Sequence, residues 1–216
     1  MKQRRLIVRF GLVVAAVSVV AGPAAAQDPR LTGRLDAGTR AAVEAALDSA
    51  RAQGLPADPL VTKALEGASK GATGARIVSA VRRLAGELAS ARTMLGYAST
   101  TEELVAGAAA LRAGAGPSAL QRVRAVRPGA PVAVHLAVLA DLLADGVPPD
   151  TAAAAVIALA RATVRDADLV AFRQSVDRDI ALGASPGSAA TVRVNSTARA
   201  DAFTNTTPNA PPRRRP

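Results

Sequence analysis

The stretch Gly54-Leu55-Pro56-Ala57-Asp58-Pro59 ends one predicted helix and begins the next. A glycine just past a helix adopts a positive φ at little cost, and the apolar residue after it closes the helix end. Proline is favoured at the first helical position, where an aspartate just before it can accept a hydrogen bond from a free backbone N–H. The pattern returns 92 residues later as Gly146-Val147-Pro148-Pro149-Asp150.

Similar start and stop signals divide residues 36–183 into about eight helices. Thr100 and Glu103 have the spacing of a capping box. Further candidate N-caps are Asp58, Asp150 and Asp166, and further candidate C-terminal glycines are Gly71 and Gly183. The predicted helices span about residues 39–53, 59–70, 74–95, 101–113, 117–127, 131–145, 151–164 and 167–182. No alternating apolar pattern typical of strands competes with them, so the predicted fold is all-α.

The recurrence of these start and stop signals indicates an internal repeat of stacked helical hairpins. Halving the offset of 92 to 46 aligns three apolar triples: Leu65, Leu111 and Ile157; Ile77, Val123 and Leu169; Leu88, Val134 and Ile180. Hairpin units come in runs of three or more because each pair leaves one face exposed. The alternative is chance self-similarity in an Ala-rich sequence. The side chains expected to contribute most to the core are Ile77, Leu84, Leu88, Ile157 and Phe172.

Residues 1–26 have the layout of a cleavable signal peptide. Four basic residues precede an apolar run over residues 10–22, and Ala24 and Ala26 form a small-residue cleavage site before Gln27. The run is too short to cross a bilayer as a helix, which argues against the alternative of a retained anchor. Arg outnumbers Lys 24 to 3, which together with the abundance of Ala suggests a GC-rich bacterial gene. We therefore expect Sec-type export to the periplasm or the exterior.

The net charge of +10 is concentrated at the two ends of the chain. Residues 1–26 and residues 184–216 each carry +4, so the domain and the short linker before it, residues 27–183, carry only +2. A nucleic-acid partner is therefore not expected. The segment 184–216 is poor in apolar residues and rich in Pro, Ser, Thr and Asn, which predicts disorder. Its Arg213, Arg214 and Arg215 are candidates for contact with an anionic surface, and a solubilising tail is the alternative.

The sequence offers few residues for catalysis. It has no Cys and one His, which excludes thiol enzymes, iron–sulfur proteins and most metal sites. Gly67-Ala68-Ser69-Lys70-Gly71 matches the nucleophile-elbow pattern, but it lies at a predicted helix end instead of following a strand, and the one candidate base is His135. A further group of carboxylates consists of Asp166, Asp168, Asp177 and Asp179, which lack the spacing of a calcium loop. We predict no catalytic, cofactor or metal site.

Two functions are compatible with these features. The first is a non-enzymatic protein-interaction or scaffold module of the bacterial envelope, with a protein partner whose identity the sequence does not indicate. The alternative is a periplasmic carrier that holds a lipid or another apolar small molecule between Ala-lined helices.

Overall fold

A computed structural model describes residues 28–162 and 165–204, and this part of the chain is all-helical with no strand. The elements are η1 (Pro29–Leu31), α1 (Ala37–Ala52), α2 (Asp58–Ser69), α3 (Gly74–Leu95), α4 (Thr101–Arg112), α5 (Pro117–Val126), α6 (Ala133–Ala144), α7 (Pro149–Arg161), α8 (Asp166–Ala181) and α9 (Pro186–Thr204). The predicted all-α class is confirmed, and each of the eight predicted helices is present with ends shifted by at most about three residues.

The glycine-marked helix ends form as the sequence predicts. Gly54 and Gly146 have φ of 71° and 85°. The N–H of Leu55 donates to the carbonyl of Ala50 at 2.9 Å, and the N–H of Val147 donates to that of Leu142 at 2.9 Å. Each joins the second residue after the glycine-terminated helix end to a carbonyl of the last helical turn, as in a Schellman motif. Leu55 and Val147 are buried, so each helix end is also sealed by an apolar contact.

The helix starts are predicted correctly in one place and incorrectly in three. Thr100 and Glu103 form the reciprocal capping box. Asp58, in contrast, is the first residue of α2 and does not cap it; its carboxylate instead accepts a hydrogen bond from Arg30 at 2.6 Å. Asp150 and Asp166 likewise lie inside the first turns of α7 and α8. Each helix begins at or before the aspartate, so the carboxylate adds only favourable charge near the helix N-terminus.

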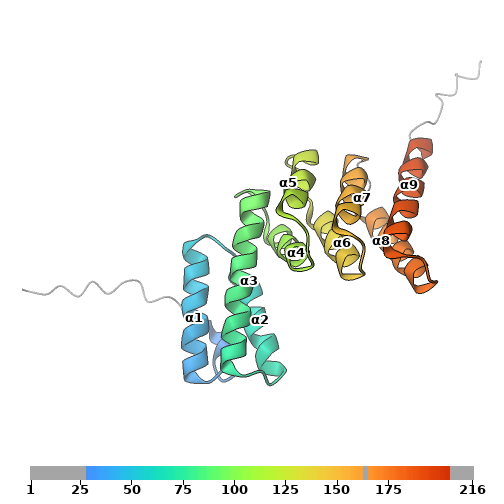
Figure 1. The fold of residues 1–216 in the computed structure, drawn as a ribbon. Helices are drawn as coiled ribbons and strands as arrows, with labels where there is room; N and C mark the ends of the chain where they lie inside the picture. Colours follow the sequence, from blue (N-terminus) through green and yellow to red (C-terminus); the bar gives the residue numbers. More distant parts are fainter. Residues whose placement is uncertain (1–27, 163–164, 205–216) are drawn as a thin grey trace, which may run out of the picture.

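Helices α1 to α3 form an N-terminal group in which α3 packs against both other helices (Figure 1). Helix α1 approaches α3 closely because position 74 is glycine: a Cβ there would lie 1.9 Å from Oγ1 of Thr39. The remaining helices follow as three consecutive pairs, α4/α5, α6/α7 and α8/α9, which we call hairpins (Figure 1). Helix α6 packs on α7 and α8 packs on α9, whereas α4 and α5 both pack on α3. The first helices of the hairpins pack in the series α4, α6, α8, and the second helices in the series α5, α7, α9.

The hairpins repeat at a shorter interval than the sequence suggested. Their first helices begin at Thr101, Ala133 and Asp166, which are 32 and 33 residues apart. Their second helices each begin with proline at the first position, at Pro117, Pro149 and Pro186. The predicted 46-residue unit is not confirmed, because it aligns positions in a first helix, α4, with positions in a second helix, α7. Ala-rich helices align with one another at several offsets, and only their packing distinguishes these.

The domain extends beyond both of its predicted boundaries. Residues 27–35 were expected to be a linker, yet η1 lies there and Leu31 is fully buried. The predicted end of the domain at Gly183 is also wrong, because α9 packs on α7 and α8 and buries Ala189 and Ala190. Disorder was predicted because the segment has few large apolar residues. Its alanines bury little area each, but they permit the close helix packing that α9 makes. The rest of the predicted disordered tail, residues 205–216, lies outside the described residues.

The core is built largely from Leu, Val and Ala. Four of the five side chains expected to dominate it, Ile77, Leu88, Ile157 and Phe172, are at most 4% exposed. Leu84 is only half-buried, at the edge of this cluster.

Candidate functional site

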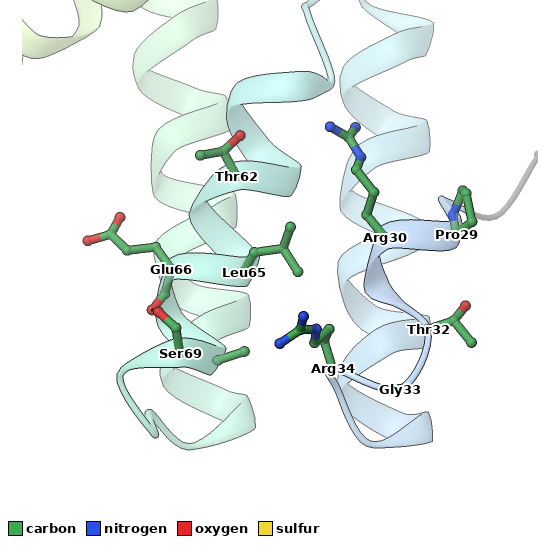
Figure 2. A pocket seen from close by; sticks show the side chains of 10 residues that line it. Pro29, Arg30, Thr32, Gly33, Arg34, Thr62, Leu65, Glu66 and Ser69 are labelled. Atoms are coloured by element: carbon green, nitrogen blue, oxygen red, sulfur yellow. The ribbon is translucent and has the colours of Figure 1, made fainter.

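A cleft of about 880 Å³ lies between the η1 segment and α2 (Figure 2). Leu65 of α2 and the guanidinium groups of Arg30 and Arg34 lie in this gap, whereas the carboxylate of Glu66 points to the other side of α2. Arg30 is held by Asp28 at 2.7 Å and by Asp58 at 2.6 Å. The lining mixes apolar Pro29, Leu65 and Ala68 with these two cations and with polar side chains, so it is neither a mainly apolar pocket nor an arrangement of a nucleophile with a base.

The two residues of the nucleophile-elbow hypothesis are not brought together. The hydroxyl of Ser69, at the end of α2, donates to the backbone carbonyl of Glu66 at 2.9 Å. His135 is fully buried in α6, and neither of its ring nitrogens has a hydrogen-bond partner. Helices α2 and α6 belong to different parts of the molecule (Figure 1). Although the sequence matches the hydrolase pattern, Ser69 and His135 do not form a catalytic pair.

Three of the four aspartates of α8 form ion pairs with arginines. Asp168 pairs with Arg165 at 2.8 Å, and Asp179 pairs with Arg193 of α9 at 2.6 Å. Asp177 lies 3.4 Å from Arg173. Within residues 28–162 and 165–204, no three carboxylate or imidazole groups converge as a metal site would require. The aspartates therefore act as helix-to-helix and intrahelical ion-pair partners.

An exposed apolar line crosses the first helices of the three hairpins. Val105 of α4, Ala137 of α6 and Val170 of α8 occupy equivalent positions, and all three are exposed, the two valines by 40% and 44%. The residues that precede them, Leu104, Leu136 and Leu169, are at most 1% exposed. Because α4 packs on α6 and α6 on α8, equivalent positions lie in line across the stack. We call Val105, Ala137 and Val170 the outward row.

The first two hairpins are joined by a buried carboxylate, Glu103 in the first turn of α4. Its Oε2 accepts from the N–H of Thr100 at 3.1 Å and lies 2.7 Å from Nη2 of Arg124 in α5. Its Oε1 accepts from the N–H of Val132, just before α6, at 3.0 Å. Arg124 also donates to the carbonyl of Ala130 at 2.9 Å. We call this arrangement the Glu103 junction; it ties α4, α5 and the start of α6 to one side chain.

The junction keeps Glu103 ionised. Burial is the largest influence and by itself raises the pKa of the carboxyl, but Arg124 and the N–H groups of Val132 and Thr100 together outweigh it. The pKa of Glu103 is therefore lowered. Sequence reasoning assigned Glu103 to the capping box and to the favourable charge of a first helical turn, but not to the junction. Its partners Arg124 and Val132 lie 21 and 29 residues away, and no local pattern indicates them.

The last hairpin differs from the first two on the side that a following hairpin would cover. Where α6 and α7 bury Leu142 and Leu159, α8 and α9 carry Ser175 and Ser196. The Arg193–Asp179 ion pair lies on the same hairpin. Polar outer faces are typical of the end units of helical stacks, because these faces stay in water. Of the three described hairpins, α8/α9 therefore has the polar face of an end unit.

No protein-family model matches this chain, and no curated protein or solved structure is significantly similar to it. Among the helices that the structure describes, none is both long and apolar enough to cross a membrane. The predicted cleavage site at Ala24, Ala26 and Gln27, like the arginines Arg213, Arg214 and Arg215, lies outside the described residues.

Proposed function

We propose that this chain is an exported, non-enzymatic protein-interaction module of a bacterial envelope, and that its partner binds along the outward row. The observation that carries the proposal is the repeated exposure of apolar side chains at equivalent positions of three stacked hairpins. Stacked helical pairs present extended surfaces of this kind. The export signal in residues 1–26 supports the envelope location, and the tail arginines Arg213 to Arg215 are proposed to add contact with an anionic surface.

The proposal is tested by crosslinking in cells followed by mass spectrometry. Val105→Glu and Val170→Glu place charge in the outward row, and we expect both to abolish the crosslinked partner. Val192→Glu is the matched control, because Val192 lies on α9, away from the row, and is 62% exposed. Reproducible absence of any partner, or a partner that survives both row variants, would contradict the proposal.

The alternative, carriage of an apolar small molecule, has less support from the clefts. The cleft beside α2 contains Arg30 and Arg34. The groove between α1 and α3 is lined mainly by alanines but also contains Arg82 and Gln53, and an open groove between α7 and α9 is mostly apolar. A bound lipid would raise the melting temperature. A lipid that does so, and that co-purifies with the chain, would favour the carrier over the interaction module.

A further inference from the structure

His135 lies in the first turn of α6, and the packing of α6 on α8 forms the seam between the second and third hairpins. His135 is the third residue of α6 and therefore occupies the position that Glu103 has in α4. Glu103 reaches forward to the residue before the next hairpin's first helix. The residue at the equivalent position of α6, His135, would reach toward the start of the next first helix, α8. Asp166, the first residue of α8, favours the charged His135 ring electrostatically.

The surroundings of His135 favour the neutral ring. Its side chain is fully buried and both ring nitrogens lack a hydrogen-bond partner. Two charged residues act electrostatically on the ring: Arg127, just after α5, and Asp166, the first residue of α8. On the α4 side Glu103 is already engaged with Arg124, and the buried residues of α7 are all apolar. Burial first, and Arg127 second, lower the pKa of His135 to about 4, while Asp166 opposes them.

The third hairpin is the part of the stack that a buried charge at this seam would release. Among residues 28–162 and 165–204 it has a hairpin neighbour on one side, and α8 packs on α6 less extensively than α6 packs on α4. End units of a helical stack open at lower free energy than inner ones. We propose that this seam is an acid-sensitive joint, in which protonation of His135 releases α8 and α9 from α6 and α7. The inference does not depend on the proposed function.

The experiment is hydrogen exchange of the intact chain at pH 7.5 and pH 5, corrected for the intrinsic pH dependence of exchange. If His135 titrates near 6.5 when the joint is open and near 4 when it is closed, the opening equilibrium rises about 30-fold between these pH values. We expect that increase in the amides of α8 and α9 and not in those of α1 to α3.

Three variants decide the cause. His135→Gln removes the titrating group and should abolish the response. Arg127→Gln should move the onset of opening to higher pH, and Asp166→Asn to lower pH, because they remove opposite charges acting on the ring. These two variants also test the joint if His135→Gln does not fold. An equal rise in all helices, an unchanged response in His135→Gln, or shifts in the wrong direction would overturn the proposal.

Discussion

Replacing Glu103 with alanine should be among the most damaging single changes in the hairpin row. The carboxylate is the common partner of Arg124 and of two backbone N–H groups, at 2.7 to 3.1 Å. Its removal leaves the buried N–H of Val132 unpaired, which costs about 1–3 kcal/mol. It also breaks a largely buried ion pair, for which the total loss is typically about 3–5 kcal/mol. We therefore expect the free energy of unfolding to fall by about 3–5 kcal/mol.

The measurement is urea denaturation followed by circular dichroism, with Glu103→Gln and Glu102→Gln alongside. Glu103→Gln keeps the shape and part of the hydrogen bonding, so we expect a smaller loss of about 1.5–3 kcal/mol. Glu102 is the matched control, since it lies in the same helical turn but is exposed. If Glu103→Ala destabilises no more than Glu102→Gln does, the assignment of the junction to Glu103 is refuted.

The pH dependence separates the junction from the His135 joint. The lowered pKa of Glu103 means that its contribution is fully present above the ordinary glutamate pKa, and is lost only as the pH falls through the lowered value. The lowered pKa of His135 means that the stability of the joint is lost earlier, as the pH falls from about 6.5 to about 4. Between pH 7.5 and pH 5, wild-type chain should therefore lose stability through His135 and not through Glu103.

Five further changes test the packing by thermal or urea denaturation. Gly74→Ala should destabilise by about 1–3 kcal/mol, because its Cβ meets a side chain of α1, whereas Gly86→Ala, with open space around the added Cβ, should stabilise by about 0.5–1 kcal/mol. Phe172→Ala, at a site only 2% exposed, should cost about 3–5 kcal/mol. Asp145→Asn should stabilise the chain near neutral pH by about 0.5–2 kcal/mol, since burial and the neighbouring carboxylate of α8 raise the pKa of Asp145, so that it is ionised at a cost that disappears in acid. Truncation after Gly183 should lower the melting temperature, because it removes α9 from the core, and an unchanged value would contradict the packing described here.

Local signals predicted most of the helices because they act within a few residues. The glycine-terminated ends at Gly54 and Gly146, the capping box of Thr100 and Glu103, and proline at the first position of a helix are backbone preferences that need no tertiary partner. The same locality explains the failures at Asp58, Asp150 and Asp166. An aspartate at the start of a helix suits both the N-cap and the first turn, so the pattern specifies a start only to within a residue or two.

By itself, the sequence determined the all-α class, the number of helices up to residue 182 and the scarcity of groups for catalysis. These properties follow from periodicity, punctuation and composition, which are local or additive. Only the tertiary structure decided the hairpin period, the inclusion of α9, the junction at Glu103 and the burial of His135. Each of these depends on which helix packs on which, and small, similar Ala-rich faces allow many pairings of nearly equal hydrophobic gain. Specific contacts such as that of Glu103 with Arg124 and Val132 select one pairing, and they join residues too far apart in the chain for any local pattern to reveal.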